Sequence, residues 1–121
     1  MGAAHTRALA AEGAKIVIGD VLEDEGNKLA NELGADVARF VRLDVTQADQ
    51  WQAAVTTAVD AFGSLDVLVN NAGIAKYNTI ENFDIAAWQQ VLDVNLTGTM
   101  LGMHAAVAPM KAAGGGSIIN I

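Results

Sequence analysis

The chain has 121 residues, of which 52% are apolar, and its formal net charge is −7. This length allows one domain at most, with enough apolar residues for a core. The acidic balance argues against partners such as nucleic acid or an anionic membrane surface. The absence of cysteine excludes disulfides, a thiol nucleophile and a cysteine zinc site. No apolar stretch approaches the ~18 residues of a membrane span, and the first residues lack the pattern of a secretory signal, so a cytoplasmic location is expected.

Helical and strand patterns alternate along the first half of the chain. Helix-forming residues predict helices at 2–12, 22–33 and 47–62, and Gly13, Gly34 and Gly63 follow their ends as C-terminal caps. Short apolar runs predict strands at 15–19, 37–43 and 65–69. Thr46, with Asp49 three residues later, resembles a capping box for the third helix.

A long helical pattern follows a loop that ends near Phe83. Asp84 is the expected N-cap, and the pattern continues to Ala113 with a bend near Asn95. The single proline, Pro109, lies late in this helix, where proline weakens or kinks it. A last strand is predicted at 117–121 after three glycines. This strict alternation of helices and strands indicates an α/β fold, a doubly wound parallel sheet with right-handed crossovers.

Three of the predicted strands end in small or polar residues. The first ends in Gly19-Asp20, the second in Asp44-Val45 and the third in Asn70-Asn71-Ala72-Gly73. In a doubly wound sheet the carboxyl ends lie along one edge, where ligands bind, so these residues can together hold a dinucleotide. The alternative is structural, because Asp and Asn are common turn residues.

Four motifs carry a family resemblance. They are Gly-Ala-Lys-Ile-Val-Ile-Gly-Asp, Leu-Asp-Val-Thr, Val-Asn-Asn-Ala-Gly and Val-Leu-Asp-Val-Asn-Leu-Thr-Gly. In this order and spacing they resemble the amino-terminal half of a short-chain dehydrogenase/reductase, and the resemblance runs from end to end of the chain. The bacterial NAD-dependent 3α(20β)-hydroxysteroid dehydrogenase type matches best, and the 3-ketoacyl reductases, which share most of the motifs, are the alternative. The resemblance therefore implies an incomplete Rossmann-like sheet.

The resemblance also implies roles in cofactor binding. Gly2 matches the last glycine of the family's phosphate-binding turn, and Asp20 matches the acidic residue that binds the adenosine ribose. Asp44 and Val45 match the pair that holds the adenine ring.

The two asparagine segments match further family positions. Asn71, Ala72 and Gly73 match the segment that lines the cofactor, while Asn70 supports the central sheet. Asn95 matches the asparagine of the catalytic tetrad, which organises a proton relay through the bend of its helix. Its structural alternative is an asparagine that bonds its own backbone at a helix bend.

Asp20 also predicts the cofactor. Its distance from Gly2 is close to the ~20-residue spacing of the acidic ribose ligand in dinucleotide-binding folds. A carboxylate there accepts hydrogen bonds from the ribose of NAD and repels the extra phosphate of NADP. No lysine or arginine follows in Val21-Leu22-Glu23-Asp24, so NAD is the expected cofactor. Alternatively, Asp20 only caps the helix at 22–33.

Several family elements have no counterpart in these residues. The resemblance puts a first strand and glycine-rich turn before Gly2, the catalytic serine beyond Ile121, and the Tyr-x-x-x-Lys pair further on. Glu81, not lysine, stands four residues after Tyr77, the only tyrosine, which either flanks the substrate cleft or is a loop aromatic. His5 and His104 have no partner at metal-ligand spacing, so no metal site is expected.

The resulting hypothesis is a fragment of an NAD-dependent oxidoreductase that moves a hydride between a secondary alcohol or ketone, with hydroxysteroids as candidates, and the nicotinamide. The 121-residue chain alone is expected to be inactive. One rival is a non-catalytic interaction module, and a second is a nucleotide-binding pseudoenzyme. In the family, the helices between Asp84 and Ala113 resemble a dimerisation surface, so a homo-oligomer, dimer or tetramer, is expected.

Overall fold

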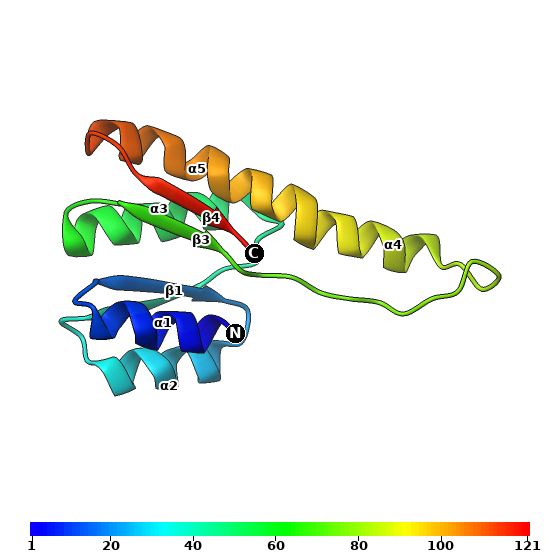
Figure 1. Cartoon of the computed structure of the whole chain (residues 1–121), viewed down its shortest axis with the longest axis horizontal. Helices are drawn as coiled ribbons and strands as arrows, with labels where there is room; N and C mark the ends of the chain where they lie inside the picture. Colours follow the sequence, from blue (N-terminus) through cyan, green and yellow to red (C-terminus); the bar gives the residue numbers. More distant parts are fainter.

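The computed structural model describes residues 1–121, in which helices and strands alternate (Figure 1). The elements are α1 (Gly2–Ala11), β1 (Ile16–Asp20), α2 (Glu23–Leu33), β2 (Ala38–Arg42), α3 (Ala48–Phe62), β3 (Val67–Asn70), α4 (Ile85–Leu92), η1 (Asp93–Thr97), α5 (Gly98–Ala112) and β4 (Ser117–Asn120). The predicted α/β fold is confirmed, and the predicted boundaries differ from the observed ones by two residues at most. No helix is both long and apolar enough to cross a membrane.

The strands form two parallel pairs. β1 pairs with β2, so that Asp20 lies opposite Arg42, and β3 pairs with β4, so that Asn70 lies opposite Asn120. β1, β3 and β4 point the same way in Figure 1 and β2 runs parallel to β1, which brings the carboxyl ends of the strands to one side of the molecule. No ladder joins the two pairs, so each strand is hydrogen-bonded to a neighbouring strand along one edge only.

The hydrophobic core is small and lies against β3. Only 16 of the 121 residues are buried. Six of them form one cluster from β3, α3, α5 and the end of β2: Leu43, Trp51, Ala54, Leu68, Ala106 and Met110. The molecule therefore relies on few buried side chains.

Helix α5 packs closely through glycines on its buried face. A Cβ atom at Gly102 would lie 2.5 Å from Oδ1 of Asn70 and 2.8 Å from the Trp51 ring. A Cβ atom at Gly98 would lie 2.7 Å from the Val45 side chain. All three distances are too short for a carbon atom, so only glycine allows this approach.

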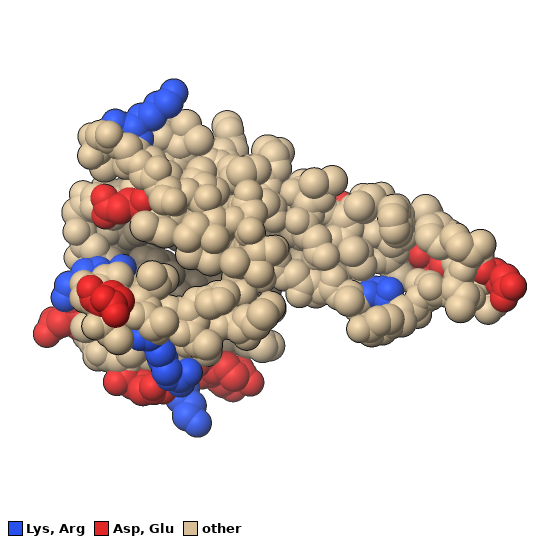
Figure 2. Space-filling view, in the orientation of Figure 1, with Lys and Arg blue, Asp and Glu red and all other residues tan.

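The long helix predicted after Asp84 is present as α4, η1 and α5. Asp84 caps α4, since its Oδ1 accepts hydrogen bonds from the N–H groups of Ala86 and Ala87. At the predicted bend near Asn95 the helix contains η1, a turn of π-helix, and α4, η1 and α5 follow one another without a break. α4 and the loop before it project beyond the strand pairs, as both the ribbon and the space-filling view show (Figure 1, Figure 2). Pro109 lies inside α5 without ending it.

The predicted capping box at Thr46 is wrong. The N-cap of α3 is Gln47, which forms no capping hydrogen bond through its side chain. The Thr46 hydroxyl instead donates to Oδ1 of Asp44 at 2.7 Å. Thr46 thus shapes the turn after β2 rather than the helix start.

Candidate functional site

Asp20 ends β1 at the carboxyl edge and is exposed to solvent. Its Oδ1 accepts a hydrogen bond from the N–H of Leu22 at 3.0 Å, where the chain turns into α2. Asp20 therefore shapes the turn before α2, but the predicted alternative that it caps this helix is wrong, because the N-cap is Leu22 and no side chain makes a capping hydrogen bond. One carboxylate oxygen remains free for a ligand.

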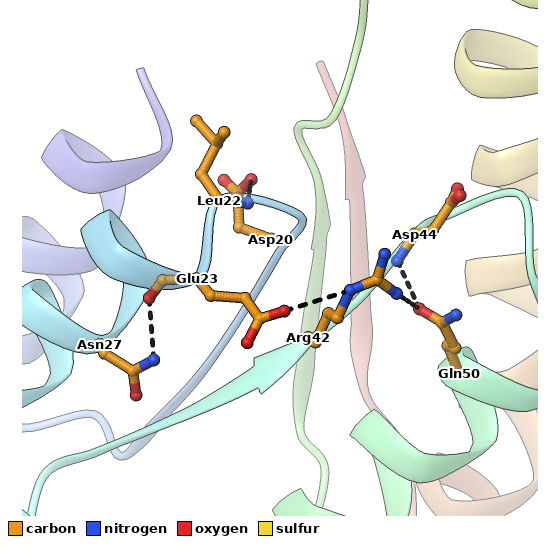
Figure 3. Close-up of polar contacts among 7 residues, drawn as sticks. All are labelled: Asp20, Leu22, Glu23, Asn27, Arg42, Asp44 and Gln50. Atoms are coloured by element: carbon orange, nitrogen blue, oxygen red, sulfur yellow. Dashed lines mark hydrogen bonds and ion pairs between the residues drawn. The ribbon is translucent and has the colours of Figure 1, made fainter.

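Arg42 lies directly across from Asp20, at the end of β2 (Figure 3). Its Nε is 3.3 Å from Oε1 of Glu23, and its Nη1 donates to Oε1 of Gln50 at 3.3 Å. The expectation that no lysine or arginine lies near Asp20 is therefore wrong. That expectation was based only on the residues that follow Asp20 in the sequence, whereas parallel pairing of β1 and β2 brings Arg42 beside it.

The turn at Asp44 and Val45 is held by two side chains of α3. The Asp44 N–H donates to Gln50 at 2.8 Å, and the Val45 carbonyl accepts from Nε1 of Trp51 at 2.9 Å, both on α3. Hydrogen bonds from the Thr46 hydroxyl and N–H lower the pKa of Asp44 below its ordinary value, with a smaller contribution from the charge of Arg42. The carboxylate is therefore ionised at neutral pH and firmly placed.

The N-terminus of α1 meets the carboxyl end of β3. A Cβ atom at Gly2 would lie 3.2 Å from Nδ2 of Asn71, so a larger residue would crowd this contact. Oδ1 of Asn71 is buried without a hydrogen-bond partner, as is Nδ1 of His5 on α1. No side chain caps the first N–H groups of α1. Free N–H groups at a helix N-terminus can donate hydrogen bonds to phosphate, and the Asp20 carboxylate can accept them from ribose hydroxyls. The residues at this edge therefore fit a dinucleotide.

Asn70 connects β3 to β4 and faces α5. Its Nδ2 donates to Oδ1 of Asn120 at 2.9 Å, and its own Oδ1 is buried without a partner. The side chain therefore ties the strands together beneath Gly102.

Asn95 connects η1 to the segment that follows β3. Its Oδ1 accepts from the N–H of Ile74 and its Nδ2 donates to the Ile74 carbonyl, both at 2.9 Å. A Cβ atom at Gly73 would lie 3.6 Å from the Asn95 side chain, an ordinary contact. Gly73 and the exposed Ala72 thus lie between Asn71 and the position that Asn95 holds.

Tyr77 and one surface hollow take no part in the hydrogen bonds of this edge. Tyr77 lies on the projecting loop with 98% of its surface exposed, so here it is a loop aromatic. A surface hollow lined by Lys15, Asp36, Arg39 and Phe62 lies at the amino ends of β1 and β2, opposite the candidate site.

Comparisons with known proteins agree with this arrangement. A family model described as short chain dehydrogenase matches residues 1–121. The chain belongs to the short-chain dehydrogenase family. Members of this family generally bind a nicotinamide cofactor, NAD or NADP.

Three similar proteins illustrate the range of relatives. The chain is 64% identical over 121 residues to a 3-alpha-(or 20-beta)-hydroxysteroid dehydrogenase of Mycobacterium tuberculosis, covering all of this chain and 46% of that protein. It is 54% identical over 129 residues to a trans-4-hydroxycyclohexanecarboxylate dehydrogenase of Sinomonas cyclohexanicum, of which it covers 49%. It is 44% identical over 124 residues to a 2,5-dichloro-2,5-cyclohexadiene-1,4-diol dehydrogenase of Sphingobium indicum, again covering 49%. The chain thus spans about half the length of the curated relatives that it matches.

The recognition from sequence motifs is confirmed, including the similarity to hydroxysteroid dehydrogenases. The cofactor roles of individual residues, from Gly2 to Gly73, and the catalytic role of Asn95 stay predictions. Sequence reasoning missed Arg42 and its partners Glu23 and Gln50. The signal that could have found Arg42 was its place at the end of the strand predicted to lie beside Asp20.

Proposed function

We propose that the chain is the cofactor-binding part of an NAD-dependent oxidoreductase that interconverts a secondary alcohol and a ketone. The observation that carries this proposal is Asp20, which stands at the carboxyl end of β1 with one carboxylate oxygen free. When bound, the nicotinamide supplies the hydride acceptor or donor. The residues of this chain bind and orient the cofactor, with Asp20 accepting hydrogen bonds from the ribose and the α1 N-terminus facing the phosphates.

We propose that Asn95 positions neighbouring groups for the reaction and does not itself exchange protons with the substrate. Its amide holds the backbone of Ile74, which follows the segment that lines the cofactor. The acid/base tyrosine that the family resemblance implies is not among these 121 residues. Asn95 would therefore act together with groups from the rest of a longer enzyme.

The names of the relatives support a substrate class. One acts on hydroxysteroids, one on a hydroxycyclohexanecarboxylate and one on a cyclohexadienediol, so all three names describe alcohols of alicyclic compounds. We therefore favour a cyclic secondary alcohol, with hydroxysteroids as the first candidates, over a 3-ketoacyl thioester. The 3-ketoacyl reductase alternative would be supported by turnover of acetoacetyl thioesters alone.

A full-length hybrid enzyme allows this proposal to be tested. In this hybrid, residues 1–121 replace the matching segment of the Mycobacterium tuberculosis relative. Oxidation of NADH should be measured with a ketosteroid, 4-oxocyclohexanecarboxylate and an acetoacetyl thioester. Reduction of a cyclic ketone supports the proposal. A folded hybrid that binds no nicotinamide nucleotide contradicts it.

A second candidate function is self-association, with or without catalysis. Large apolar side chains remain exposed along α4, η1 and α5: Ile85, Trp88, Leu96, Met100 and Val107. We propose that a second copy of the chain covers this helical face, giving a homodimer or a tetramer. Sedimentation of the hybrid and of its Leu96→Glu variant tests this, with Thr97→Glu as the matched control on the same turn. Loss of association in the first variant alone supports the interface, and equal behaviour of both refutes it.

A further inference from the structure

The edge that would hold the adenosine ribose contains an unexpected cation. Arg42 lies in register with Asp20, and it is the one cationic side chain among the seven residues of Figure 3. Free guanidinium groups bind phosphates through paired hydrogen bonds. An arginine beside the ribose position would by itself favour the extra phosphate of NADP, in conflict with Asp20.

Two neighbours occupy this guanidinium. Nε lies 3.3 Å from Oε1 of Glu23 in the first turn of α2, and Nη1 donates to Gln50 at 3.3 Å. Glu23 neutralises the charge, whereas Gln50 only directs the group. Gln50 also accepts from the Asp44 N–H at 2.8 Å, so its position is fixed by the turn after β2.

The Glu23–Arg42 pair is exposed and therefore easily perturbed. The side chains of Arg42 and Glu23 are 53% and 58% accessible. Exposed pairs of this kind contribute little to stability, so removing the carboxylate should leave the fold intact. The ion pair matters instead for the charge near the ribose position. It cancels the positive charge of Arg42 there, so that the negative charges of Asp20 and Asp44 dominate.

We propose that Glu23 is a specificity-determining residue, which neutralises Arg42 and so prevents it from binding the 2′-phosphate of NADP. This inference rests on the proposed function, because it assumes that the Asp20 edge binds the ribose. Cofactor discrimination then depends on two carboxylates, with Asp20 repelling the phosphate directly and Glu23 occupying the group that would attract it. NAD lacks the phosphate and is unaffected by the state of Arg42.

The test uses Glu23→Gln in the full-length hybrid, with dissociation constants for NADH and NADPH measured by nucleotide fluorescence. Releasing an exposed ion pair should strengthen NADPH binding about fivefold, with NADH changed by less than about twofold. Adding Arg42→Met to Glu23→Gln should cancel the gain. Asp24→Asn is the matched control, since it removes the same charge from the same turn of α2 without an ion pair to Arg42.

The outcomes separate this inference from the proposed function. A gain in NADPH binding that requires both the loss of Glu23 and the presence of Arg42 supports it. An equal gain in Asp24→Asn, a gain that survives Arg42→Met, or no gain at all overturns it while NADH binding by the parent still supports the proposed function. A parent hybrid that binds neither nucleotide overturns both.

Discussion

The side-chain amide of Asn95 forms a pair of hydrogen bonds, each 2.9 Å long, with the backbone N–H and C=O of Ile74. Only an amide side chain offers one acceptor and one donor side by side in this way. The π-helical turn η1 places Asn95 so that both groups reach the loop after β3. This pair of hydrogen bonds is therefore the connection between the π-helical turn of the long helix and the segment at the candidate cofactor site.

Replacing Asn95 by Ala should impair catalysis more than folding. In the hybrid we expect kcat to fall about 100-fold, within the range of a lost proton-transfer assistant, with the dissociation constant of NADH changed by less than about threefold. The lost hydrogen bonds should cost about 1 kcal/mol each in unfolding free energy. Thr97→Ala, an exposed change on the same turn, is the control. Parallel losses of kcat, NADH affinity and stability would show that Asn95 has only a structural role.

Gly102 should not tolerate a methyl group. Alanine ordinarily stabilises a helix by up to about 1 kcal/mol relative to glycine. At Gly102, however, the new carbon would lie 2.5 Å from Oδ1 of Asn70 and 2.8 Å from Trp51. We expect Gly102→Ala to lower the unfolding free energy of the hybrid by about 1–3 kcal/mol. Gly73→Ala, with its nearest contact at 3.6 Å, should change stability little. Stabilisation by Gly102→Ala would contradict the close packing of α5.

Protonation of Asp44, in the turn after β2, should lower the stability of the protein in acid. Hydrogen bonds from Thr46 hold the pKa of Asp44 below its ordinary value. The folded state thus favours the ionised carboxylate, whose stabilising contribution is complete above about pH 4 and is lost as the pH falls through the lowered pKa.

Thr46→Val removes the hydroxyl donor and should raise the pKa of Asp44, so acid unfolding of the hybrid should begin at a higher pH. Carbon-detected NMR titration of the Asp44 carboxyl measures the pKa directly. Thr57→Val is the control, because its hydroxyl bonds the Ala53 carbonyl rather than a carboxylate. An unchanged Asp44 pKa in Thr46→Val would refute the assigned cause.

Local sequence patterns predicted the helices and strands well, but they did not predict the side-chain contacts between elements that are distant in sequence. Asp84 was identifiable as a cap because the cap bonds its own helix, and an irregularity near Asn95 was expected within the helical pattern. The contact of Arg42 with Glu23 joins strand and helix ends that are far apart in sequence, so it depends on strand register. The capping box at Thr46 was predicted wrongly because its hydroxyl bonds the carboxylate of Asp44. Asp44 lies before the helix, and the capping-box pattern considers only residues within it.

The isolated 121-residue chain should lack both a cooperative melt and dehydrogenase activity. Its strands form separate pairs with unpaired edges, and only 16 residues are buried. Unpaired edges promote aggregation, and the small core leaves little of the usual ~5–15 kcal/mol of stability. The sequence also lacks a Tyr-x-x-x-Lys pair. Calorimetry and NADH oxidation with cyclic ketones check both expectations. A sharp two-state melt of a dilute monomer, or turnover that Asn95→Ala abolishes, would contradict them.

The central claim is that Asp20 makes this chain the NAD-binding part of a dehydrogenase, and the cofactor preference of the hybrid tests it most directly. The measurement is kcat/KM with NADH and with NADPH, for the parent and for Asp20→Ala. We expect the parent to favour NADH by about 30-fold or more, since like charges side by side cost ~2 kcal/mol or more. Asp20→Ala should narrow that ratio by weakening NADH binding and relieving the repulsion of NADPH. Equal use of the two cofactors by the parent, or a ratio unchanged in Asp20→Ala alongside a loss of stability, would contradict the claim and leave Asp20 with only its structural role in the turn before α2.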